Sequence, residues 1–382
     1  MYKFNISAPA TVFLHGDFME NYDKTSIAAG LNIRTKLTFS SLPPNAVKVD
    51  FIELNFSRIK LHIKIPLTTY LQHFNQIESA EFIEEIQVFR KIQTFVNSLV
   101  IDCDTYDYNN LEHFLSLQAF FFLLVLIAHR DSIKITASFV VKISSELPIG
   151  NGLGSSASFA VCLAACFWRW SLLQKGKCIY EFDERDRLKI GYYSDICDDF
   201  IFNSSTRINV NVSVNGSISI YNNGCLTKTY DDFPSIKILL VSSNVKQESV
   251  QNRQFDIMRD SCSIINPILD NINVLSNIAV DYLQSIGGRV IPQDLILLNQ
   301  GLLNALGASH PYVDIICAIA QNYSLRGKMT YRGRCGYVFI VLPPNFMDND
   351  LFRLINELES YNFSATVTNL CGKWNGMRVE SY

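Results

Sequence analysis

Residues 146–157 read Glu-Leu-Pro-Ile-Gly-Asn-Gly-Leu-Gly-Ser-Ser-Ala, a segment rich in glycine and serine. Its three glycines, at alternate positions, let the backbone approach an oxyanion within hydrogen-bonding distance. Residues 139–143 before it have the apolar character of a strand, and residues 158–170 after it predict an unbroken, buried helix. The free amides and the dipole at the start of such a helix favour anions. The order strand, glycine loop, helix therefore predicts a phosphate-binding loop.

The spacing of these glycines fits neither Gly-x-x-x-x-Gly-Lys-Ser/Thr nor Gly-x-Gly-x-x-Gly, so the P-loop and dinucleotide fingerprints are excluded. On the glycines alone, a turn that only joins a strand to a helix is the alternative. The whole pattern Pro-x-Gly-x-Gly-Leu-Gly-Ser-Ser-Ala at 148–157, however, resembles the nucleotide-binding loop of the GHMP small-molecule kinases, and in detail that of the mevalonate kinases. Further segments resemble the same family along nearly the whole chain: 7–17, 28–35, 117–120, 303–317 and 328–330.

The resemblance implies an α+β, two-lobed GHMP kinase fold with the ligand cleft between the lobes. Residues 1–225 would form the amino-terminal domain, which carries the nucleotide loop, and residues 226–382 the carboxy-terminal domain. Apolar periodicity agrees with a mixture of strands and helices. It predicts strands at 36–40, 47–54, 58–65, 236–242 and 336–342, and helices at 79–100, 249–285, 293–321 and 349–360.

Composition narrows the class of protein. Of 382 residues, 48% are hydrophobic, which is enough to build a full core in one or two domains. The net charge of −3, with basic residues scattered, gives no reason to expect nucleic acid as a partner. The ten cysteines form no Cys-x-x-Cys pair and suggest reduced thiols. The start of the chain lacks signal-peptide features, and the longest apolar run, 117–128, is shorter than the roughly 20 residues of a membrane span. We therefore expect a cytoplasmic protein without a membrane partner.

The family resemblance implies ATP and Mg²⁺ as cofactors. Ser156 matches the serine whose hydroxyl binds the metal, while Asn55 and Ser145 match positions that contact the nucleotide. For Asn55, an ordinary surface asparagine is the alternative. The complete set of expected nucleotide-binding residues is Asn55, Ser145, Gly150, Asn151, Gly152, Leu153, Gly154, Ser155 and Ser156.

The acidic ligand of the metal is less well defined. The family's metal-binding glutamate matches Cys197, but Asp198 is adjacent and would reach the metal if the register shifted by one residue. Asp195 and Asp199 are further alternatives. A solvated helix end without a metal is the structural alternative for this acidic cluster.

The charged catalytic positions of the family are changed in this chain. Where the mevalonate kinases have Ala-Pro-Gly-Lys, this chain has Ala-Pro-Ala-Thr, with Thr11 in place of the lysine. The best match to the segment of the catalytic aspartate is 204–209, which puts Ile208 at the acid position, and isoleucine cannot accept a proton. No catalytic pair is therefore intact, and Asp198 or Asp17 would have to substitute.

On the substrate side the resemblance implies His15 and Asp17, although Phe18 replaces a second histidine and His15 could instead be a packing residue. The third family motif, 330–336, has lost most of its glycines. Its Arg332 and Arg334 either enter the cleft and bind phosphate or turn outward into solvent.

Two functions follow from these substitutions. The first is an ATP-dependent kinase that phosphorylates the primary hydroxyl of mevalonate, in isoprenoid and sterol precursor synthesis. The second is a pseudokinase that keeps the fold to bind a ligand or a protein partner. The resemblance is also compatible with a homodimer.

Overall fold

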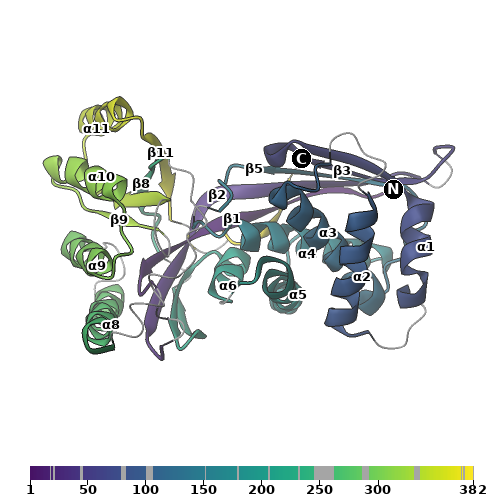
Figure 1. Cartoon of the computed structure of the whole chain (residues 1–382), viewed down its shortest axis with the longest axis horizontal. Helices are drawn as coiled ribbons and strands as arrows, with labels where there is room; N and C mark the ends of the chain where they lie inside the picture. The colour runs from purple at the N-terminus through teal and green to yellow at the C-terminus, as the bar shows by residue number, and fades with distance from the viewer. Residues whose placement is uncertain are drawn as a thin grey trace.

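The computed structural model describes residues 1–17, 19, 22–43, 46–78, 83–99, 106–150, 152–178, 180–204, 207–230, 233–244, 262–285, 292–330, 336–370, 372 and 375–381. These residues form two sheets, each with its own helices (Figure 1). Helices α1 to α5 pack beside the larger sheet, and α8 to α11 surround the smaller one at the other end of the molecule. The architecture is the mixed α+β fold expected from the sequence.

The larger sheet has eight strands in the order β12-β1-β2-β5-β3-β4, with β6 paired to β2 and β7 to β6. Only the β3–β5 pair among these is parallel. The strands are β1 (Lys3–His15), β2 (Thr25–Ser41), β3 (Phe51–Phe56), β4 (Leu61–Pro66), β5 (Phe139–Ser145), β6 (Ile218–Asn222), β7 (Cys225–Tyr230) and β12 (Arg378–Glu380). A short 3₁₀ helix, η2 (Ser57–Ile59), joins β3 to β4.

The helices that accompany this sheet are α1 (Leu67–Glu78), α2 (Glu85–Ser98), α3 (Leu111–Asp131), α4 (Ser155–Gln174), α5 (Glu184–Phe202) and α6 (Ile208–Asn215). Helices α3 and α4 are apolar on nearly all sides because they lie in the middle of the core. Both are long and apolar enough to cross a membrane by length and composition, contrary to the expectation from residues 117–128. However, 72% of the apolar window of each is buried within the fold, as in core helices.

The smaller sheet has four antiparallel strands in the order β11-β8-β10-β9. They are β8 (Lys237–Ser242), β9 (Gly327–Met329), β10 (Tyr337–Val341) and β11 (Ser364–Asn369). The accompanying helices are α8 (Cys262–Ser285), α9 (Gln293–Ala305), α10 (Pro311–Asn322) and α11 (Asp348–Ser360).

The first two strands connect the two parts of the molecule. Strands β1 and β2 are 13 and 17 residues long and pair over almost all of β1. Their far ends contribute Val12, Leu14 and Ile27 to an apolar cluster that also contains Leu240 of β8 and Phe339 of β10. The carboxyl end of β1 is therefore packed against the smaller sheet and its helices.

Several predicted boundaries differ from the structure. The helix predicted at 293–321 is two helices, α9 and α10, because Gly307 adopts a positive φ of 69° and Pro311 starts a new helix. The predicted helix at 79–100 is observed as α2, and residues 79–82 and 100 lie outside the described residues. For the helix predicted at 249–285, α8 covers 262–285 and the remainder is outside the described residues.

The expected division at residue 225 stays a prediction. Strand β7 begins at Cys225 and pairs with β6, so the larger sheet continues past that point. Near the end of the chain, β12 returns to pair with β1, and both chain ends lie against the larger sheet (Figure 1).

Candidate active site at the glycine loop

The glycine loop lies between the end of β5 and the start of α4. Gly150, Gly152 and Gly154 have φ values of 75°, 76° and 65°, a region that residues with a side chain avoid. Helix α4 contains the helix expected at 158–170 and begins at Ser155, directly after the glycines, where no side chain among the described residues caps it. The amides of its first turn are thus free for an anionic ligand. Asn151, another expected nucleotide contact, lies outside the described residues.

Strand β1 runs directly beneath this loop. The amide of Thr11 donates to the Leu153 carbonyl at 3.0 Å, and the Ser158 hydroxyl of α4 donates to the Ala8 carbonyl at 3.0 Å. A Cβ added to Gly154 would lie 2.2 Å from Thr11 Oγ1. Gly154 is therefore required both by its backbone conformation and by its contact with Thr11.

Thr11 forms a hydrogen bond with Asn209, in the first turn of α6. Its Oγ1 donates to Asn209 Oδ1 at 2.8 Å, and Thr11 is only 1% exposed. The Ser213 hydroxyl holds α6 against β1 by donating to the Pro9 carbonyl at 3.0 Å. An uncharged pair thus occupies the place where the resemblance implied a lysine and an aspartate.

The residue that meets Thr11 differs from the one expected. Ile208, the expected counterpart of the acid, is wholly buried in an apolar cluster with Ala28, Val212 and Tyr221. If Ile208 faced Thr11, its apolar side chain would contact polar groups. The orientation of α6 therefore places Asn209 next to Thr11. Val212, one helical turn after Ile208 and therefore on the same face, was the signal in the sequence for this one-residue correction.

Asp198 of α5 lies beside Ser156 at the start of α4. The Asp198 side chain is 2% exposed, and neither carboxylate oxygen has a hydrogen-bond partner with good geometry among the described residues. Burial raises the pKa of Asp198 to about 6, and the nearby hydroxyls of Ser204 and Ser156 oppose that rise. Cys197, the alternative match, is buried in the apolar core. Asp198 is therefore the acid that meets Ser156, and it is not a solvated helix end.

The oxygen donors of Ser156 and Asp198 could hold a divalent cation. Mg²⁺ prefers oxygen ligands and usually takes only one or two from the protein, because waters and substrate phosphates supply the others. Within the described ranges, His, Cys, Asp and Glu side chains do not gather in groups of three or more that could hold a metal. An open site shared with a bound nucleotide suits this donor set better than a closed protein cage.

The other two acids of this helix differ from Asp198. Asp195 is half-buried, and burial raises its pKa to about 7, with the positive charge of Arg207 acting in the opposite direction. Asp199 is exposed. Asp195 is thus a second carboxyl group on α5 that titrates near neutral pH.

On the substrate side, His15 and Asp17 are 1% and 3% exposed at the carboxyl end of β1. Asp17 Oδ2 is 2.6 Å from Nζ of Lys328, a wholly buried residue of β9. Burial, and secondarily the charge of Lys328, lowers the pKa of His15 to about 3, so its ring is neutral. The sequence analysis included Lys328 in the segment 328–330 that resembles the family but did not assign it to the site.

Two expected nucleotide contacts lie on strands of the larger sheet. Ser145 Oγ is 3.0 Å from Thr35 Oγ1 and accepts the amide of Leu147, so it ties the start of the loop to β2. Asn55 is half-buried on β3. Nucleotide contact by these two residues stays a prediction. Phe18, Arg332 and Arg334 lie outside the described residues.

Comparisons with known proteins agree with this arrangement. Residues 121–194 match the GHMP kinases N terminal domain. The chain is 26% identical to the mevalonate kinase of Homo sapiens over 96% of this chain and 92% of the relative. It is 27% identical to the mevalonate kinase of Candida albicans, covering 98% and 89% of the two chains.

Solved structures show the same fold. The mevalonate kinase of Methanococcus jannaschii superposes with a TM-score of 0.68 at 17% identity, over 97% of this chain and 99% of that one. The L. major mevalonate kinase in complex with R-mevalonate gives a TM-score of 0.62 at 12% identity, over 97% and 96%. Residues 121–194 thus match a GHMP kinase N-terminal domain, and the chain is a homologue of the mevalonate kinases over nearly its whole length.

Proposed function

We propose that this protein is an ATP- and Mg²⁺-dependent kinase that phosphorylates the primary hydroxyl of mevalonate, a step in isoprenoid and sterol precursor synthesis. The observation that carries the proposal is the pairing of Asp198 with Ser156 at the start of α4. Asp198 is 2% exposed and has only the hydroxyls of Ser156 and Ser204 near its carboxylate among the described residues, and such a buried charge is costly unless a cation compensates it. That cost is understandable if the site exists to bind a metal with its nucleotide.

The residues present fit both cofactors. The amides of Gly152 to Ser156 would hold the phosphates of ATP, and Ser156 with Asp198 would hold Mg²⁺. When bound, Mg²⁺ would offset negative charge on the phosphates. The mevalonate kinase relatives, including one solved with R-mevalonate, support mevalonate as the acceptor. A homodimer and a cytoplasmic location remain predictions.

In the reaction, the hydroxyl oxygen of the acceptor forms a bond to the γ-phosphorus while the bond between that phosphorus and the ADP oxygen breaks. The hydroxyl proton must leave, and because the Asn209 amide cannot accept it, we expect it to pass to the carboxylate of Asp17 or Asp198. Thr11 likewise supplies no positive charge. Because much of phosphoryl-transfer catalysis is positioning and electrostatic stabilisation, transfer remains feasible without this pair. We expect a turnover below that of a kinase with both charges.

The hydrogen bond between Thr11 and Asn209 favours a second function, a pseudokinase. It satisfies both side chains with each other, so neither is held ready for a proton transfer. A pseudokinase would bind Mg·ATP or another ligand of the same site and release no ADP.

Two measurements on the wild-type protein separate these functions. Calorimetric titration with ATP should show binding that strengthens when Mg²⁺ is added. A coupled assay of ADP release should then show turnover that depends on R-mevalonate. Binding without mevalonate-dependent turnover would favour the pseudokinase. Lack of any Mg²⁺-dependent ATP binding would contradict the kinase and leave only a pseudokinase that binds another ligand or a protein partner.

A further inference from the structure

The ammonium group of Lys328 is buried next to the carboxyl end of β1 and contacts residues there. Lys328 of β9 is 0% exposed, and its Nζ lies 2.6 Å from Asp17 Oδ2. The same nitrogen donates to the carbonyl of Phe13 at 3.2 Å and to that of Met329 at 3.1 Å. The ammonium group is thus wholly buried among two backbone carbonyls and the Asp17 carboxylate. We therefore expect any effect of Lys328 on a ligand to pass through these neighbours.

The buried ion pair between Lys328 and Asp17 stabilises the position of β9 poorly, because burying two charges costs free energy. Burial lowers the pKa of Lys328, and only the neighbouring Asp17 opposes this effect. Replacing a buried ion pair with apolar residues is often neutral or stabilising. Strand β9 is also held by its ladder with β10 and by the Met329 amide, which donates to Gln300 Oε1 at 2.9 Å. The need to hold β9 in place therefore does not explain why Lys328 and Asp17 are charged.

His15 beside this pair is held with one nitrogen available. The Asn299 amide nitrogen lies 3.3 Å from His15 Nδ1, and because an amide nitrogen only donates, Nδ1 accepts. The proton of the neutral ring is then on Nε2, which has no partner among the described residues. Next to the end of β1 a carboxylate and a ring N–H thus lie buried, the ring held by Asn299 and the carboxylate by its ion pair with Lys328.

We propose that Lys328 is a positioning residue for the substrate side of the site, which acts by fixing the Asp17 carboxylate and the backbone at Phe13. This inference rests on the proposed function, because it takes Asp17 and His15 as the groups that meet the acceptor. A carboxylate held by a buried cation needs no reorganisation when it accepts a hydrogen bond from a hydroxyl of the acceptor.

A double-mutant cycle on R-mevalonate affinity, measured by calorimetry, tests this role. Lys328→Met should weaken mevalonate binding by about tenfold or more, the scale of a lost supporting partner, and leave Mg·ATP affinity unchanged. In an Asp17→Asn background the same substitution should have almost no further effect, because Lys328 acts through Asp17. If Lys328→Met weakens mevalonate binding equally in both backgrounds, or not at all, the proposal is wrong.

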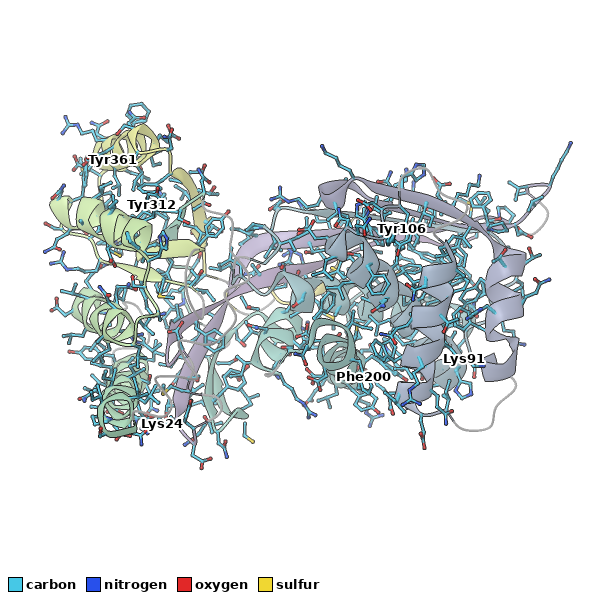
Figure 2. All side chains as sticks on the ribbon, in the orientation of Figure 1. Lys24, Lys91, Tyr106, Phe200, Tyr312 and Tyr361 are labelled. Atoms are coloured by element: carbon cyan, nitrogen blue, oxygen red, sulfur yellow. The ribbon has the colours of Figure 1, made fainter. Side chains whose placement is uncertain are left out.

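The matched control is Lys24→Met. Lys24 also joins the two parts of the molecule, through an ion pair with Asp270 of α8 at 2.5 Å, but this pair is exposed, and Lys24 lies at the edge of the molecule beside α8 (Figure 2). This variant should bind mevalonate as the wild type does. Equal losses in the Lys24 and Lys328 variants would mean that ion pairs between the parts act only through stability.

A second measurement does not depend on mevalonate binding. It is needed if the Lys328→Met variant is too unstable for calorimetry, or if the wild type does not bind mevalonate, a result that would refute the proposed function. Lys328→Gln keeps a hydrogen-bond donor and removes the charge. In nitrogen-15 NMR of labelled histidine, the His15 pKa should rise by about one unit or more in this variant, the scale of a nearby charge. An unchanged His15 signal would overturn the proposal.

Discussion

The two sides of the candidate site depend on different chemical groups, backbone on one side and side chains on the other. The nucleotide side depends on backbone: three glycines with positive φ and the uncapped start of α4. The transfer side depends on two side chains, Thr11 and Asn209, which form a neutral hydrogen bond. Backbone amides come with the fold and survive most substitutions, whereas side-chain charges disappear with one substitution each. This difference explains how a chain can keep the glycine loop of the family while it lacks the charged pair expected beside it.

The largest effect should come from Gly152→Val. The new side chain would stand where phosphate must approach, and ATP affinity should fall on the order of 100-fold, as when preorganised donors are lost. Gly176→Val is the matched control, because Gly176 has the same φ of 76° with nothing within 4 Å of an added Cβ. Both variants should lose similar stability from backbone strain. Similar ATP affinities in calorimetry would refute the phosphate-binding role of the loop.

A smaller effect should follow Asp198→Asn. The amide is a weaker ligand for Mg²⁺, so the gain in ATP affinity on adding Mg²⁺ should fall by roughly tenfold or more. Asp199→Asn, at an exposed neighbouring position, should leave that gain unchanged. Calorimetric titrations with and without Mg²⁺ measure both. If adding Mg²⁺ still increases ATP affinity fully in the Asp198 variant, Asp198 is not a ligand of the metal.

The smallest effect concerns the pH dependence of stability. The pKa of Asp195 is raised to about 7, so between pH 8 and pH 5 the folded protein takes up a proton that the unfolded chain does not bind. The contribution of Asp195 to the free energy of unfolding therefore increases as the pH falls from 8 to 5. His15, with a lowered pKa, acts in the opposite direction but is common to both proteins.

Denaturant unfolding at pH 8 and pH 5, compared between wild type and Asp195→Asn, isolates this contribution. Wild type should gain on the order of 1–2 kcal/mol relative to the variant on going to pH 5. A constant difference between the two proteins at both pH values would show that Asp195 titrates in its ordinary range.

Local signals in the sequence predicted the elements around the loop well. Glycines followed by an apolar run located β5, the loop and the start of α4, because turn chemistry and periodicity are properties of neighbouring residues. Burial of α3 as a core helix also agreed with its composition. The break between α9 and α10 was missed although Gly307 and Pro311 indicate one, since both flanking segments continue the apolar pattern.

Contacts between distant segments were less predictable. The pairs Thr11 with Asn209 and Ser156 with Asp198 each differ by one residue from the first family match, and only packing decides which side of a helix meets β1 or α4. The partner of Asp17 lies more than 300 residues away on β9, and no local pattern connects the two. Such pairings depend on tertiary structure.

The central claim is that the neutral pair, and not the nucleotide side, limits phosphoryl transfer. Its most direct test is the mevalonate-dependent turnover of the double variant Thr11→Lys with Asn209→Asp, at saturating Mg·ATP. Either substitution alone should lower stability, because each adds a charge without its partner to a buried site. Together they should restore the fold and raise turnover on the order of 100-fold over wild type, the scale of a positioned acid or base. A double variant that binds Mg·ATP and mevalonate normally but turns over no faster than wild type would contradict the claim.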